Sequence, residues 1–164
     1  MVAVSREAVW QYLEEVKDPE VPVLSVVELG IVRDVRVDGQ GVTVVITPTY
    51  SGCPAMHIIE ADIRAGLESH GVSPVKIETA FTPAWTSDWI SSAAKAKLVA
   101  YGIAAPGPAA EDGGLVTLTR RAPVQCPYCK STRTTLKSEF GATACKSINF
   151  CEDCRQPFEQ FKAI

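Results

Sequence analysis

Residues 31–47 read IVRDVRVDGQGVTVVIT, in which two runs rich in β-branched side chains flank the Asp-Gly-Gln-Gly segment at 38–41. β-branched residues favour strands, and a short Asp-Gly segment between two such runs indicates a β-hairpin. We therefore expect strands at 31–37 and 42–47. Three apolar residues of the second run alternate and should share one face of the sheet: Val42, Val44 and Ile46.

Helices and a further strand are expected around this hairpin. Residues 6–17 carry apolar side chains at helical spacing behind Ser5, a good N-cap residue, and residues 55–69 carry a second stripe of the same kind. A third strand is expected at 75–80 and a third helix at 89–101. The order α-β-β-α-β-α predicts a small α/β sandwich domain.

A segment rich in alanine, proline and glycine at residues 104–114 has the composition of a linker. We therefore expect two domains, residues 1–103 and residues 115–164. The second should be a small, β-rich domain with three short strands: 115–119, 132–138 and 157–162.

Two Cys-x-x-Cys pairs occur in the second domain, CPYC at 126–129 and CEDC at 151–154, with 21 residues between them. A two-residue gap lets the backbone form a knuckle that points both sulfurs at one ion, and two knuckles complete a tetrahedron for Zn²⁺. The sequence predicts a zinc ribbon with one structural zinc per chain, held by four ligands: Cys126, Cys129, Cys151 and Cys154. Four thiolates leave no position for water, so hydrolytic zinc chemistry is not expected. The other interpretations are two disulfides or four buried thiols.

Cys145 is a fifth cysteine of this domain, six residues before Cys151 and too far away to join that pair. It is either packed inside the ribbon or close enough to exchange with a ligand. A cluster held by some of the five C-terminal cysteines is a further alternative, because thiolates bind zinc and iron–sulfur centres alike.

Cys53 is the only cysteine before residue 126. Pro54 favours the first turn of a helix, which places Cys53 at or beside an N-cap, where backbone N–H groups lower the pKa of a thiol. Gly52 would leave room for a ligand to approach the sulfur. His57, four residues later, is a candidate base or ligand, or a hydrogen-bonded surface residue. The alternative for Cys53 is a small buried apolar residue, and no resolving cysteine is near it in the sequence for thiol redox catalysis.

The composition describes a small protein with a hydrophobic share of 46%, a charged share of 21% and a net charge of −3. No segment is apolar enough to span a bilayer, and residues 1–16 lack the continuous apolar stretch of a signal peptide. We therefore expect a cytoplasmic protein with no membrane partner. The negative charge argues against nucleic-acid binding, which needs a basic face.

Several segments carry a resemblance to known families. The first domain resembles the iron–sulfur-assembly domain of SufT and of cytosolic iron–sulfur targeting factors, in four segments: DPEVP (18–22), ELGIV (28–32), TPTYSGCPA (47–55) and TPAWTSDWI (82–90). The run SEFGATACK at 138–146, set between the two cysteine pairs, is similar to the PaaD family. PaaD proteins are accessory proteins encoded with the phenylacetyl-CoA epoxidase of aerobic phenylacetate breakdown.

The resemblance implies roles for four residues of the first domain. Cys53 corresponds to the reactive cysteine, and Asp18, Glu20 and Trp85 belong to the signature. From local features alone, Asp18 and Glu20 also fit a turn that ends a helix, and Trp85 also fits a packed anchor.

The resemblance implies a non-catalytic accessory or maturation factor that helps assemble or insert an iron–sulfur or di-iron centre. In that interpretation Cys53 transiently holds iron or a cluster, or contacts the acceptor, and the partners are the epoxidase oxygenase, its iron–sulfur reductase or iron–sulfur carrier proteins. A cluster normally takes four ligands, so a homodimer, a partner or exogenous ligands would have to complete the set. The alternative is a stoichiometric subunit or scaffold of the epoxidase.

Overall fold

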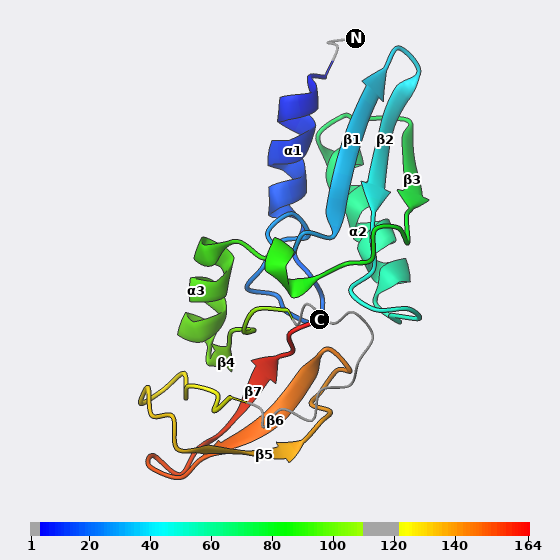
Figure 1. Cartoon of the computed structure of the whole chain (residues 1–164). Coiled ribbons are helices and arrows are strands. Elements are labelled where there is room, and N and C mark those ends of the chain that lie inside the picture. The colour runs from blue at the N-terminus through cyan, green and yellow to red at the C-terminus, as the bar shows by residue number, and fades with distance from the viewer. Residues whose placement is uncertain (1–3, 110–121) are drawn as a thin grey trace. The chain divides into compact units, whose positions relative to one another are not determined.

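The computed structural model describes residues 4–109 and 122–164, which form two compact units (Figure 1). The first unit contains residues 4–85 and 89–91, and the second contains 86–88, 92–109 and 122–164. The strand expected at 115–119 lies outside the described residues. Among the residues that the structure describes, no helix has both the length and the apolar character that a membrane span requires.

The first unit is built from two helices and a three-stranded sheet. Its elements are α1 (Arg6–Glu15), β1 (Val32–Asp38), β2 (Gly41–Ile46), α2 (Met56–Ser69) and β3 (Val75–Thr79). The strand order is β1-β2-β3, with β1 antiparallel and β3 parallel to β2. The predicted hairpin is confirmed, and Asp38 pairs with Gly41 at its turn.

The core of the first unit lies between the two helices and the sheet. The helix α1 packs against α2 and β1, and α2 packs against β3. The three residues predicted to share a face, Val42, Val44 and Ile46, are all buried. Ser5 caps α1 as expected, since its hydroxyl accepts a hydrogen bond from the N–H of Ala8 at 3.1 Å.

The second unit joins a helix to a four-stranded sheet. Its elements are α3 (Ser92–Tyr101), β4 (Ile103–Ala104), β5 (Thr134–Ser138), β6 (Lys146–Cys151) and β7 (Pro157–Phe161). The strand order is β4-β7-β6-β5, in which β4 is parallel to β7 and the other pairs are antiparallel. A mixed α/β fold with a β-rich C-terminal region is therefore confirmed.

The structure differs from the sequence-based expectation in three elements. A 3₁₀ turn, η1 (Ser87–Trp89), precedes α3, so the helix begins at Ser92 instead of residue 89. The two-residue strand β4 (Ile103–Ala104) was not expected. It hydrogen-bonds to β7, and both β4 and α3 belong to the second unit. The strand β6 was also not expected, because Lys146, Ser147 and Asn149 interrupt its apolar pattern, although all three are buried.

Candidate functional site

The four cysteines of the two pairs lie on two knuckles with the same backbone geometry. In the first knuckle (residues 126–131) the N–H of Lys130 donates to the carbonyl of Cys126 at 3.0 Å. In the second knuckle (residues 151–156) the N–H of Arg155 donates to the carbonyl of Cys151, also at 3.0 Å. Lys130 and Arg155 have φ values of +64° and +61°, so both knuckles close through a left-handed residue after the second cysteine.

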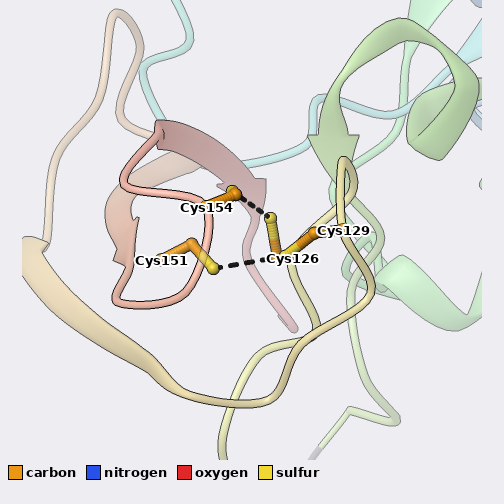
Figure 2. A group of neighbouring side chains, drawn as sticks. All are labelled: Cys126, Cys129, Cys151 and Cys154. Atoms are coloured by element: carbon orange, nitrogen blue, oxygen red, sulfur yellow. Dashed lines mark hydrogen bonds between the residues drawn. The ribbon is translucent and has the colours of Figure 1, made fainter.

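The knuckles point four sulfurs at one place (Figure 2). The Sγ atoms of Cys126 and Cys154 are 3.7 Å apart, those of Cys129 and Cys151 are 3.5 Å apart, and all four lie within 4.8 Å of one another. Zn–S bonds of about 2.3 Å in a tetrahedron place sulfurs about 3.8 Å apart. None of the four is in a disulfide. The donor set and its spacing therefore fit a tetrahedral metal ion, and we assign these residues as a metal-binding site.

The electrostatics of the sulfurs also favour a cation. A hydrogen bond from the backbone N–H of Cys154 is the main cause that lowers the pKa of Cys151 to about 7. Burial is the main cause that raises the pKa of Cys154 to about 12, and hydrogen bonding with the other three thiols adds to it. Four clustered sulfurs therefore do not all ionise by themselves, whereas a bound divalent ion favours the thiolate form of each.

Cys145 lies outside this metal-binding site. It is buried just before β6, and its Sγ is 3.0 Å from the hydroxyl oxygen of Thr143. It is therefore packed inside the ribbon, which was one of the two interpretations of the sequence.

Cys53 lies in the loop between β2 and α2, and it is not the N-cap of the helix. The helix begins at Met56, and its N-cap is Ala55. The carbonyl of Cys53 instead accepts a hydrogen bond from the N–H of Met56 at 3.3 Å, in the turn that leads into α2. Pro54 thus occupies this preceding turn, so the predicted position of Cys53 at or beside the N-cap is wrong.

The environment of Cys53 keeps its sulfur protonated. Burial is the largest cause that raises the pKa of the Cys53 thiol, and the carboxylates of Glu20 and Asp18 raise it further. Hydrogen bonds from the backbone of Ala55 and the side chain of Tyr50 act in the opposite direction but are outweighed. The lowered pKa expected from an N-cap position is therefore not found, and the thiol is neutral near pH 7.

Asp18 and Glu20 come from the turn after α1 and lie near Cys53. Asp18 is 5% exposed, and its Oδ1 accepts hydrogen bonds from the N–H groups of Glu20 and Val21, both at 2.8 Å. Asp18 therefore shapes the turn, as one interpretation of the sequence held, while Glu20 remains half-buried. Both carboxylates nevertheless act on the same thiol.

His57 and Trp85 have different surroundings. His57 is exposed in the first turn of α2 and is not among the groups that shift the pKa of Cys53. Trp85 is 4% exposed, and its Nε1–H donates to the carbonyl of Leu29 at 2.9 Å, so it anchors its segment to the first unit. No role was predicted for Tyr50, whose side chain hydrogen-bonds to Cys53. Its place in the segment 47–55, which contains Cys53, was the signal that could have identified it.

Cys53 and the two carboxylates do not form a ready-made ligand set. Within residues 4–109 and 122–164, the four ribbon cysteines are the only group of three or more His, Cys, Asp or Glu side chains whose ligand atoms lie close enough together to bind one ion. The loop around Cys53 is open on one side, because no atom lies within 4 Å of a Cβ placed on Gly52. Additional ligands for a metal at Cys53 would therefore have to come from outside the described residues.

Comparisons with known proteins match both units. Residues 6–78 match the family model described as iron–sulfur cluster assembly protein, and residues 110–162 match the model described as PaaD zinc β-ribbon domain. A "Fe-S protein maturation auxiliary factor" of Porphyromonas gingivalis is 41% identical over 57% of this chain and 90% of its own length. A solved structure of the domain of unknown function DUF59 from Bacillus anthracis is 29% identical, covers 57% of this chain and 90% of its own, and has a TM-score of 0.54.

One relative spans nearly the whole chain. It is a subunit of the "Putative 1,2-phenylacetyl-CoA epoxidase" of Escherichia coli K12, and it is 42% identical over 95% of this chain and 92% of its own length. This similarity covers the loop of Cys53 and both metal knuckles, as well as the run at 138–146 that resembled PaaD. The chain therefore belongs to the PaaD family, in which an iron–sulfur cluster assembly domain is followed by a zinc β-ribbon domain.

Proposed function

We propose that this chain is a non-catalytic maturation factor that helps assemble or insert an iron–sulfur or di-iron centre in a phenylacetyl-CoA epoxidase system. Membership of the PaaD family supports an accessory role in iron–sulfur assembly. The observation that carries the proposal is the placement of Cys53, a buried thiol beside Glu20 and Asp18 in the unit that matches the assembly family.

The neutral thiol of Cys53 suits a transient role. Iron binding would replace the S–H bond with an S–Fe bond and release the proton to water, because the thiolate is the ligand. The carboxylates of Glu20 and Asp18 disfavour an isolated thiolate but attract a cation. A protonated thiol of this kind reacts slowly with other electrophiles, and it becomes a thiolate when the metal binds.

A cluster at Cys53 needs ligands from elsewhere, because four are normal and this unit has one cysteine. A second copy of the chain would supply a second Cys53, and the acceptor, an iron–sulfur carrier or an exogenous thiol would supply the rest. The open side of the loop at Gly52 is where such ligands would approach.

The ribbon serves this proposal as a docking module with a structural zinc ion. Two of its four cysteines, Cys126 and Cys151, are buried with Ala104 and Phe158 in the small core of the unit, and Cys154 packs against this core. Zinc with four thiolates has no open position, so the ion would stabilise the ribbon and would not take part in chemistry.

The test compares two cysteine variants in cells that depend on the epoxidase. Cys53→Ser should lower the iron content of the purified oxygenase or the cluster content of the purified reductase, and should slow growth on phenylacetate. Cys145→Ser is the matched control, because Cys145 is also buried and lies outside the zinc site. Loss of activity in the Cys53→Ser strain with both components fully metallated would contradict the loading role.

A second function is a stoichiometric subunit or scaffold of the epoxidase, and it is favoured by the name of the Escherichia coli relative, which calls that protein a subunit. Copurification of the chain with the active enzyme in a constant ratio would support the scaffold. Association only while metal is being loaded would support maturation.

A further inference from the structure

The second unit has a groove between α3 and the first knuckle, with a volume of about 530 Å³. We call it the α3–knuckle groove. Ala96 and Ala100 of α3 line it on one side, and Pro127, Tyr128 and Lys130 of the knuckle line it on the other. Neither the chemistry of Cys53 nor the binding of zinc uses this surface.

Small residues create the hollow. Ala96 and Ala100 are one helical turn apart, so their short side chains leave a depression along α3. Gly102, with φ of +93°, ends the helix, and a Cβ at this position would lie 3.0 Å from the hydroxyl oxygen of Tyr128. The glycine therefore lets the Tyr128 ring lie over the end of α3.

Two exposed tyrosines border the groove. Tyr101 is 58% exposed and Tyr128 is 55% exposed, whereas Phe158 and Phe161 of the same unit are 4% and 1% exposed. Tyrosine combines a large apolar ring with a polar tip and is enriched in the residues that dominate binding energy at protein interfaces. Two such rings beside one hollow are typical of a binding surface.

The charge of the groove is positive. Lys130 is the only charged residue among those that line it, and α3 carries Lys95 and Lys97 but no carboxylate. The Lys130 ammonium donates to the carbonyl of Pro127 at 2.7 Å, which holds the cation at the edge of the groove. This local charge contrasts with the net charge of −3 for the whole chain.

Lys130 occupies a backbone conformation that favours glycine. Its φ of +64° costs about 1 kcal/mol or more for a residue with a Cβ. A lysine at this position contributes a cation at the groove that glycine would not provide. Arg155 has the same conformation in the second knuckle, so the knuckle sets this backbone geometry and the groove uses only the lysine side chain.

We propose that the α3–knuckle groove binds an acidic segment of a partner protein. An apolar side chain of that segment would lie between Tyr101 and Tyr128, and a carboxylate would pair with Lys130. The identity of the partner rests on the proposed function, which points to the oxygenase or the reductase of the epoxidase system.

The test measures the affinity of the full-length, zinc-loaded chain for the purified oxygenase and for the purified reductase by titration calorimetry. Tyr101→Ala and Tyr128→Ala should each raise the dissociation constant about tenfold for the component that binds. Lys130→Gln should raise it about threefold at low salt and should make binding less dependent on salt. Phe140→Ala is the matched control, because Phe140 is an aromatic of the same unit, 65% exposed and outside the groove, and it should change the constant less than about twofold.

The outcomes separate this inference from the proposed function. Binding to neither component, or binding that both tyrosine variants leave unchanged with normal zinc content, would overturn the docking proposal. Normal binding by both tyrosine variants, together with a loss of metal loading in Cys53→Ser, would reject the groove and leave the maturation role intact. Tyrosine-dependent binding with no effect of Cys53→Ser on metallation would support the groove and reject maturation.

Discussion

The carboxylate of Glu20 raises the pKa of the Cys53 thiol, although the two residues belong to different loops of the first unit. Glu20 lies in the turn that follows α1, and Cys53 lies in the loop that follows β2. The carboxylate of Asp18 accepts hydrogen bonds from two backbone N–H groups of the first turn, and its charge also raises the pKa of the thiol. The turn at 18–22 and the loop at 47–55 therefore interact through charge, and a cation bound to the Cys53 sulfur would also be attracted by these two carboxylates.

Replacement of Glu20 by glutamine should make Cys53 more reactive. Removal of the negative charge lowers the pKa of the thiol, so more thiolate is present at a given pH. In the zinc-loaded protein, iodoacetamide should modify Cys53 about two- to fivefold faster at pH 8 in Glu20→Gln than in wild type. The measurement is peptide mapping by mass spectrometry.

The pH profile gives the sign of this effect. In wild type the rate should rise with pH through a value above the ordinary pKa of cysteine, and in Glu20→Gln the profile should move to lower pH. Glu68→Gln is the control, because Glu68 is exposed on α2 and does not shift the pKa of Cys53. Identical profiles for wild type and Glu20→Gln would show that the two groups do not interact.

Two glycine substitutions should differ in cost. Gly30 has φ of +72°, and a Cβ would meet the Cβ of Trp89 at 2.9 Å, whereas Gly52 has φ of +80° and nothing within 4 Å. Gly52→Ala should lower the free energy of unfolding by about 1 kcal/mol through backbone strain alone, and Gly30→Ala by about 3 kcal/mol through strain and a clash. Urea unfolding of the first unit checks this, and equal losses would show that Trp89 moves aside.

Ser87 should stabilise the second unit through Ile164. The N–H of Ser87 donates to the carbonyl of Ile164 at 3.0 Å, and the N–H of Ile164 donates to the Ser87 hydroxyl at 3.1 Å. Ser87 is fully buried but Ile164 is 40% exposed, so water can replace the lost acceptor and Ser87→Ala should cost about 0.5 to 1.5 kcal/mol. Hydrogen exchange should become faster in β7 but not in α2. The exposed Ser69, which bonds only to the nearby Gly66 carbonyl, provides the control Ser69→Ala.

Metal removal should unfold the ribbon and leave the first unit folded. Cys151 is buried in the core of the ribbon and is a ligand, so Cys151→Ser should reduce the zinc content and remove hydrogen-exchange protection from β5 to β7. Acidification should have the same effect, because protonation of the thiolates releases the ion. Cys145→Ser should retain one zinc ion, and protection of β6 that survives complete metal removal would contradict a structural role.

The local elements of the first unit were predictable from the sequence because their signals are local. Ser5, the β-branched runs and the apolar stripes of the helices each report on their own neighbours. The strand β6 was not predictable, because Lys146 is buried with its ammonium 3.1 Å from the Glu159 carboxylate of β7. A buried ion pair between strands stabilises a charge that sequence patterns assign to the surface.

The metal-binding site and the surroundings of Cys53 differed in the same way in how far the sequence predicted them. The spacing of each cysteine pair determines the knuckle, so all four metal ligands were identified from the sequence. The surroundings of Cys53 depend on the turn at Asp18 and Glu20, which only the folded chain brings close. Burial and these carboxylates outweigh the local hydrogen bonds, so the direction of the pKa shift was opposite to the expectation.

Elemental analysis of protein purified without oxygen tests the central claim most directly. Zinc, iron and acid-labile sulfide would be measured in wild type, in Cys53→Ser and in Cys145→Ser, before and after reconstitution with iron and sulfide. The maturation role predicts one zinc ion per chain in all three proteins, with iron bound to wild type and Cys145→Ser and lost in Cys53→Ser. Zinc alone in all three, with no iron after reconstitution, would contradict iron handling at Cys53 and favour a scaffold.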